Sequence, residues 1–345
     1  MKAAFIENHG DLDQIRVGDL DIPKILPNDV LIETKFAALN HLDVFLVRGW
    51  PGLNLVMPHI LGADGSGTIK EIGSEVTTVK EGDRVTINPG LSCGKCEQCL
   101  SGKQVFCKQF SIMGEHSWGT FSKYFKVPEL NVLKIPEKIP LDKAAAAPLT
   151  FLTAYTMLKT QAKVKPGEYV FIHGAGGGVS SAAIQIAKYF GAIVIATTST
   201  PEKVSKVKEL GADYVINYKQ EKDFSKHVYV NLTNKLGIDV VIDSIGQATF
   251  PTSIRLLKPG GRLITCGATS GPITKIDITQ IFWKHLEIKG STMSNQNEFH
   301  EVMKLVFRGE LSPVIDKIFS LDQVIEAEKY LVEGKQFGKV MLKII

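Results

Sequence analysis

A glycine-rich segment between a strand pattern and a helix pattern constrains the fold of this chain more than any other feature. The apolar run 169–173 leads into GAGGGVS at positions 174–180, and a helical pattern follows over 179–190 before Gly191. Glycines here let a backbone approach a phosphate closely, and the free amides at the helix N-terminus can bind it. Gly176, Gly177, Gly178 and Val179 are therefore candidate coenzyme-binding residues, although the run alone would also suit a tight turn.

The surrounding sequence repeats this strand-then-helix order. A second helix is predicted to begin at Thr200-Pro201, an N-cap followed by proline. Near-continuous apolar strands suit a parallel sheet that is buried on both faces. We therefore predict an α/β fold with a doubly wound sheet that binds a dinucleotide. The predicted strands are 169–173, 193–197, 214–217, 239–243, 262–266 and 286–289.

The first 150 residues have a different pattern, and 345 residues suffice for two domains of ordinary size. Short apolar or alternating runs separated by glycine, proline and aspartate predict a β-rich domain. The tail after residue 291 predicts two amphipathic helices and a final strand over 339–344. The clearest strand candidates of the N-terminal part are 30–34, 67–72, 84–87 and 121–127.

The end of the second predicted strand bears on the choice of coenzyme. An NAD enzyme usually places an acid about 20 residues past the glycines, where it binds the ribose hydroxyls. This chain has Thr197-Thr198-Ser199-Thr200 there, with no acid before Glu202. Thr198, Ser199, Lys203 and Tyr218 are candidates to bind a 2′-phosphate, so we predict NADP(H), with NAD(H) as the alternative. Lys203 as a surface lysine and Tyr218 as a core tyrosine remain the competing interpretation.

Four of the five cysteines form a cluster, whereas Cys266 stands alone. Cys93, Cys96, Cys99 and Cys107 follow the spacing C-x2-C-x2-C-x7-C. This spacing lets four thiolates converge on one tetrahedral zinc ion, which then has no open position and is structural. We predict one structural zinc per chain; an iron–sulfur cluster or metal-free cysteines are the alternatives.

Charge and hydropathy exclude several classes of partner. The net charge of +4 is small and dispersed, so neither nucleic acid nor a membrane surface is predicted as a partner. No apolar run reaches the roughly 18 residues of a membrane span, and the N-terminus lacks a signal-peptide core. We expect a cytoplasmic protein that acts on a small-molecule substrate.

Several short motifs together resemble the medium-chain dehydrogenase/reductase superfamily, which includes zinc alcohol dehydrogenases and quinone oxidoreductases. They are GADG at 62–65, GDRV at 82–85, the cysteine cluster, GTF at 119–121, the glycine loop and FGK at 337–339. The resemblance implies a GroES-like catalytic domain over 1–152 and 291–345, with the zinc lobe at 93–107. It implies a Rossmann coenzyme domain over 153–290 and assembly as a homodimer or homotetramer. It also implies that Thr153 lies near the nicotinamide and that Gly267 and Lys339 bind coenzyme.

The catalytic zinc of that family does not carry over. By resemblance its three ligand positions fall on Asn40, Ala63 and the vicinity of Leu149, none of which is a good zinc ligand. Leu42 stands where a hydroxyl residue relays the alcohol proton. The acids beside the ligands are retained as Asp43 and Asp64, so Asp43 stays a catalytic-site candidate.

Loss of that zinc changes the predicted chemistry. Alcohol–ketone interconversion needs a Lewis acid that stabilises the alkoxide. Quinones and α,β-unsaturated carbonyls instead delocalise the negative charge that hydride transfer brings, and hydrogen-bond donors can stabilise it. We therefore predict an NADPH-dependent reductase of such acceptors, in which Asn40 donates a hydrogen bond to the substrate oxygen or serves only as a structural amide. Two alternatives remain. One is an alcohol dehydrogenase with a different metal site, whose ligands come from His41, Asp43, His59 and Asp64. The other is a non-enzymatic NADP(H)-binding protein.

Overall fold

The computed structural model describes all residues, 1–345, and the chain forms two compact units. The first contains Met1–Leu152 and Met293–Ile345, and the second contains Thr153–Thr292. The second unit is therefore inserted into the sequence of the first. No helix is both long enough and apolar enough to cross a bilayer.

The first unit is built mainly from strands. Its largest sheet has the order β10-β6-β5-β3-β18-β17, with β9 paired to β3, and smaller sheets are β2-β1-β4 and β7-β8. The strands are β1 (Lys2–Ile6), β2 (Arg16–Asp19), β3 (Asp29–Ala38), β4 (His59–Ile60), β5 (Asp64–Ile72), β6 (Arg84–Ile87), β7 (Gly90–Leu91), β8 (Ser111–Ile112), β9 (Tyr124–Pro128), β10 (Val132–Lys134), β17 (Ile315–Ser320) and β18 (Lys339–Lys343).

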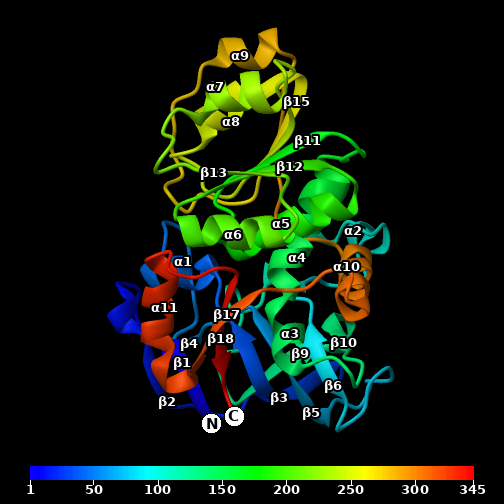
Figure 1. The fold of residues 1–345 in the computed structure, drawn as a ribbon. Coiled ribbons are helices and arrows are strands. Elements are labelled where there is room, and N and C mark those ends of the chain that lie inside the picture. Colours follow the sequence, from blue (N-terminus) through cyan, green and yellow to red (C-terminus); the bar gives the residue numbers. More distant parts are fainter. The chain divides into compact units, whose positions relative to one another are not determined.

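The C-terminal tail completes this sheet. Strand β18 pairs antiparallel with β3, so the red end of the chain lies beside a blue strand in Figure 1. Strand β17, which the sequence did not predict, pairs parallel with β18. The pairing of β18 with β3 brings Lys339 next to the residues that follow Ala38. The helices of this unit are α1 (His41–Arg48), α2 (Glu97–Leu100), α3 (Leu141–Ala146), α10 (Gln296–Arg308) and α11 (Val324–Val332), and α4 (Pro148–Tyr155) runs from this unit into the second.

The second unit is a six-stranded parallel sheet with helices between its strands. Its order is β13-β12-β11-β14-β15-β16, the doubly wound arrangement in which the connections change direction between β11 and β14. The predicted fold class, a GroES-like part and a Rossmann part, is confirmed. The elements are β11 (Tyr169–Ile172), α5 (Gly178–Tyr189), β12 (Ile193–Thr198), α6 (Pro201–Glu209), β13 (Tyr214–Asn217), α7 (Phe224–His227), β14 (Ile238–Asp243), α8 (Phe250–Leu256), β15 (Leu257–Thr265), α9 (Ile278–Trp283) and β16 (Glu287–Gly290).

Candidate functional site

The four clustered cysteines converge in space. Their sulfur atoms all lie within 4.8 Å of one another. No other group of three or more histidine, cysteine, aspartate or glutamate residues in the chain brings its ligand atoms this close together. The Sγ–Sγ distances are 3.8 Å for Cys93–Cys99, 3.6 Å for Cys96–Cys99 and 3.6 Å for Cys93–Cys107. Sulfurs bound tetrahedrally to zinc at about 2.3 Å lie about 3.8 Å apart. The donor set and its spacing therefore fit one structural zinc ion.

The segment that carries these cysteines has little structure of its own. It contains only the one-turn helix α2 and a short 3-10 turn, Gln104–Phe106. Leu100 is 77% exposed and Phe106 is 68% exposed, so apolar packing contributes little to it. The backbone N–H groups of Lys95 and Cys96 lower the pKa of the Cys93 thiol to about 6, whereas burial and the neighbouring thiols raise the pKa of Cys96 to about 11. The cluster without metal therefore favours the thiolate at Cys93 and not at Cys96.

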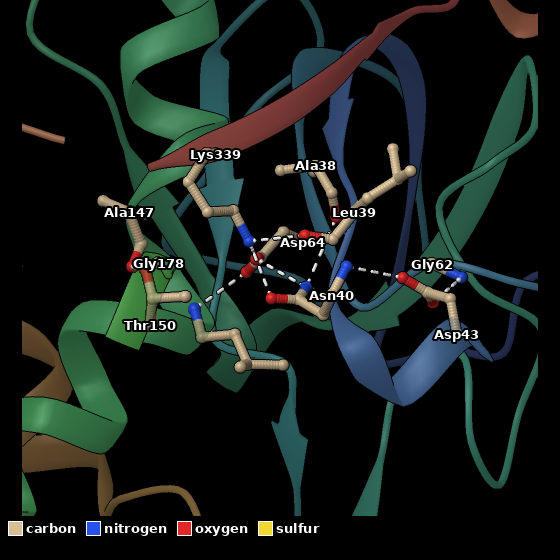
Figure 2. A network of polar contacts seen from close by, with 12 residues as sticks. Ala38, Leu39, Asn40, Asp43, Gly62, Asp64, Ala147, Thr150, Gly178 and Lys339 are labelled. Atoms are coloured by element: carbon tan, nitrogen blue, oxygen red, sulfur yellow. Dashed lines mark hydrogen bonds and ion pairs between the residues drawn. The ribbon is translucent and has the colours of Figure 1, made fainter. Parts of the chain in front are cut away.

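A second polar cluster lies at the start of α1. Asn40 directly precedes this helix, and its backbone N–H donates to Asp43 Oδ2 at 2.8 Å. Asp43 Oδ1 accepts from the backbone N–H of Gly62 at 3.1 Å. Asp43 thus ties the first turn of α1 to the segment just before β5, as Figure 2 shows.

Asp64, the first residue of β5, is fully buried and has several donors. Its Oδ2 accepts from Asn40 Nδ2 at 3.0 Å and lies 3.2 Å from Lys339 Nζ, while Oδ1 accepts from the backbone N–H of Leu149 at 2.8 Å. The ammonium supplies the compensating charge that a buried carboxylate requires. Asp64 is therefore the centre of this network (Figure 2).

Asn40 and Lys339 both have their donors engaged within this unit. The two N–H bonds of Asn40 Nδ2 reach Asp64 and, at 3.3 Å, the carbonyl of Ala38. Lys339 Nζ donates to Leu39 O at 2.8 Å, to Asn40 Oδ1 at 2.6 Å and to Asp64 Oδ2. Lys339 is 3% exposed. A lysine ammonium has three N–H groups, so contact between Lys339 and a coenzyme phosphate would require one of these bonds to break.

Glu328, which the sequence analysis did not single out, is buried beside the same cluster. It lies on α11, which packs against α1 and β18, and it is 0% exposed. Neither carboxyl oxygen has a hydrogen-bond partner. Burial and the negative charge of Asp43 raise the pKa of Glu328 well above its usual value, against the effect of Lys339. Burial also raises the pKa of Asp43, to about 7.

We expect Glu328→Gln to make thermal stability less dependent on pH. The folded protein holds the Glu328 proton more tightly than the unfolded chain, whose carboxyl titrates near 4.5. The stabilisation is therefore complete below that pH and is lost as the pH rises through the folded value. Tm of the variant should equal that of the parent at pH 4 and exceed it by several degrees at pH 8, since each kcal/mol shifts Tm by about 2–4 °C. Thermal unfolding followed by circular dichroism across this range measures the difference.

Glu326→Gln is the matched control, because Glu326 lies on the same helix with its side chain 60% exposed. Its Tm should follow the parent at every pH. If the Tm of Glu328→Gln differed from that of the parent by the same amount at every pH, the result would contradict a protonated Glu328.

In the second unit the glycine loop lies at the carboxyl end of β11. Helix α5 begins at Gly178 with Gly177 as N-cap, and no side chain caps it. Residues 176–179 are partly exposed. Ser180 stands where the third glycine of the usual fingerprint would be, and its Oγ donates to His173 O at 2.8 Å. These features leave the first amides of α5 suited to an anion.

The residues predicted to select the coenzyme gather at the carboxyl end of β12. Thr198 is the last residue of this strand, and its carbonyl accepts from the N–H of Tyr218 at 3.1 Å. Ser199 follows directly. Lys203 lies in the first turn of α6, where its N–H donates to Thr200 Oγ1 at 3.3 Å. The structure thus brings the four candidates to one strand end, and it places Thr153, 5% exposed, within α4.

A cavity of about 400 Å³ lies at the carboxyl ends of β14, β15 and β16. Gly267 lines it, and a Cβ there would approach Ser244 O to 3.1 Å. Cys266 also lines it, and burial raises the pKa of its thiol to about 12, which suits packing rather than nucleophilic chemistry. Ser291 was not predicted; its buried Oγ has no partner and belongs to the wall of this cavity.

Comparisons with known proteins agree with this architecture. Residues 26–137 match the family model of the alcohol dehydrogenase GroES-like domain, and residues 178–308 match that of zinc-binding dehydrogenases. A zinc-type alcohol dehydrogenase-like protein of Schizosaccharomyces pombe is 31% identical over 96% of both chains. The chain belongs to the zinc-type medium-chain dehydrogenase/reductase superfamily.

Other members of the superfamily that match the chain differ in their reactions. An acryloyl-coenzyme A reductase of Sulfurisphaera tokodaii is 30% identical over 99% of this chain and 100% of its own length. A crystal structure of an NAD-dependent alcohol dehydrogenase is 41% identical, covers 100% of both chains and has a TM-score of 0.96. The chain is therefore an oxidoreductase of the medium-chain type, and these similarities leave its substrate open.

Two of the three positions that the resemblance assigns to the catalytic zinc lie in an apolar cluster here. Ala63, Leu149 and Leu42 belong to one cluster of packed side chains, together with Ile112 and Met293. These side chains offer no ligand atom to a metal. Asn40, at the remaining ligand position, is bound into the network with Asp64 and Lys339.

The four residues of the alternative metal site do not bring three ligand atoms together as the cysteines do. His59 Nε2 is bonded to Gly114 O at 2.9 Å, and the ring of His41 lies 6.5 Å from that of Phe45. The carboxylates of Asp43 and Asp64 bind the backbone and side-chain donors described above. The structure therefore gives no support to a metal site formed by these four residues.

Proposed function

We propose that the chain is an NADPH-dependent reductase of quinones or α,β-unsaturated carbonyls. The observation that carries this proposal is the apolar cluster in which Ala63 and Leu149, at two positions that the resemblance assigns to the catalytic zinc, pack with Leu42. Reduction of an isolated ketone needs a strong electrophile at the oxygen, which such side chains do not supply. An acceptor that delocalises the arriving charge needs only hydrogen-bond donors.

The bound coenzyme would supply a hydride, and the residues of the chain would position the acceptor. We propose that Asn40 turns one N–H toward the substrate oxygen. The N–H that reaches Ala38 O is the better candidate, because its 3.3 Å bond is longer than the 3.0 Å bond to Asp64. Asp43 would hold Asn40 in place through the bond to its backbone N–H. Thr153 remains a candidate near the reactive ring through the resemblance alone.

The coenzyme proposal rests on the carboxyl end of β12. Thr198 and Ser199 offer hydroxyl groups there, where an acid would repel a 2′-phosphate. Lys203 and Tyr218 belong to the same strand end and could contribute a charge and a phenol. The residues 176–179 would bind the pyrophosphate, and Gly267 would line the cavity at the nicotinamide end.

A panel of acceptors tests the proposal on the purified protein. We expect about one zinc per chain, and reduction of a quinone or an enone that is faster with NADPH than with NADH. Alcohol oxidation together with about two zinc ions per chain would favour an alcohol dehydrogenase instead. Coenzyme binding without turnover of any quinone, enone or aldehyde would favour the binding-protein alternative. Light scattering on the same sample tests the expected dimer or tetramer.

A further inference from the structure

A buried chain of hydrogen bonds crosses the coenzyme unit beneath the proposed coenzyme site. Its centre is Asp243, the last residue of β14, which is 0% exposed. Oδ1 accepts from the backbone N–H groups of Ile245 at 2.9 Å and Gly246 at 3.0 Å. Thr249 Oγ1 lies within 2.9 Å of both oxygens, and Ser253 Oγ donates to Oδ2 at 2.7 Å. Asp243 thus fixes the loop that follows its strand.

The series of hydrogen bonds continues from Ser253 to His173. The Ser253 hydroxyl also lies 3.1 Å from Thr249 O, but the shorter bond to the Asp243 carboxylate is charge-assisted and takes its hydrogen. Its oxygen then accepts from His173 Nε2 at 3.0 Å, so the Nε2–H tautomer is present. Burial lowers the pKa of His173 to about 4, against the charge of Asp243, so the ring is neutral at pH 7.

The two ends of this series of hydrogen bonds lie at the two parts of the proposed coenzyme site, the glycine loop and the cavity. His173 directly precedes the glycine loop, and its carbonyl accepts from Ser180 Oγ in the first turn of α5. At the other end, Gly246 lines the cavity at the ends of β14 to β16. The link is therefore continuous from the pyrophosphate loop to the cavity wall, and it joins β11 and β14, between which the sheet changes direction.

We infer that Asp243, Ser253 and His173 are positioning residues that hold the pyrophosphate loop and the nicotinamide cavity at a fixed spacing. None of the three reaches a ligand, since their exposures are 0%, 0% and 2%. A dinucleotide that spans both parts gains affinity from their fixed spacing, whereas a ligand that touches one part gains none. The inference rests on the proposed coenzyme binding and adds a coupling between its two halves.

Ser253→Ala tests this coupling by removing the central hydroxyl. We expect the dissociation constant of NADPH to rise about fivefold to tenfold, which lies within the range for the net contribution of one typical hydrogen bond. The dissociation constant of 2′-phospho-ADP-ribose, which lacks the nicotinamide, should change less than twofold. KM for NADPH should rise, and kcat at saturating NADPH should stay within twofold. Coenzyme fluorescence and competition titrations measure these quantities.

Thr252→Ala is the matched control, since Thr252 is a partly exposed hydroxyl on the same helix. Both ligands should bind it as they bind the parent. Should Ser253→Ala not fold, Ser253→Cys keeps a side chain of similar size, weakens the bonds to Asp243 and His173, and is expected to give the same separation of the two ligands.

Two results would overturn the inference. One is an NADPH dissociation constant within twofold of the parent. The other is an equal rise for both ligands, which would place the effect at the pyrophosphate loop alone. A parent protein that binds neither NADPH nor NADH would instead contradict the proposed function, so the two failures are distinguishable.

Discussion

Replacing Cys96 with serine is expected to abolish stoichiometric zinc binding and to lower Tm by several degrees. Its sulfur lies 3.6 Å from that of Cys99, and a serine hydroxyl is a poor substitute for a thiolate ligand. The lobe has one helical turn and exposed apolar residues, so its folding energy must come largely from the ion. We expect residues 93–107 to become sensitive to protease, while the remaining folded protein keeps its activity per coenzyme site.

Cys266→Ser is the control for this prediction. Cys266 is the one cysteine outside the cluster, so its replacement alters thiol chemistry and leaves the four candidate ligands intact. Its zinc content should equal that of the parent. Zinc content by atomic emission and Tm by scanning calorimetry decide the matter. Equal zinc and equal Tm in Cys96→Ser and the parent would show that Cys96 is not a zinc ligand on which the lobe depends.

The coenzyme unit was the most predictable part of the fold. Its strands are apolar runs between glycine turns, and β13 spans 214–217 as expected. The Thr200-Pro201 signal likewise marks the start of α6, where Thr200 Oγ1 accepts from the N–H of Lys203. Strand β17 was missed because only Phe319 of its six residues is buried, so the sequence IDKIFS shows no clear alternation.

The site was harder to predict, because its polar contacts join distant segments. Close spacing reveals the cysteine cluster, whereas Lys339 and Asp64 are 275 positions apart and meet through the pairing of β18 with β3. Glu328 did leave a signal. It stands four residues after Val324 and one after Ala327 on the buried face of α11, where an acid interrupts an apolar pattern.

The polar cluster makes Lys339→Met the second large expected effect. The substitution leaves Asp64 as a fully buried carboxylate without its cation, and it removes the donor to Leu39 O and Asn40 Oδ1. Breaking a buried ion pair from one side typically costs about 3–5 kcal/mol. The free energy of unfolding should fall by this amount in urea titrations at pH 7. Lys343→Met, an exposed lysine of the same strand, should leave it within about 0.5 kcal/mol.

The double variant Asp64→Asn, Lys339→Met separates the cost of the unpaired charge from the cost of lost packing. With both charges removed, Asp64 no longer contributes an unpaired buried charge, so the double variant should be more stable than Lys339→Met alone. A double variant that is destabilised by the sum of the two single effects would mean that the 3.2 Å contact contributes no coupling. Partial recovery would instead show that Lys339 stabilises the fold chiefly by neutralising the buried Asp64 carboxylate.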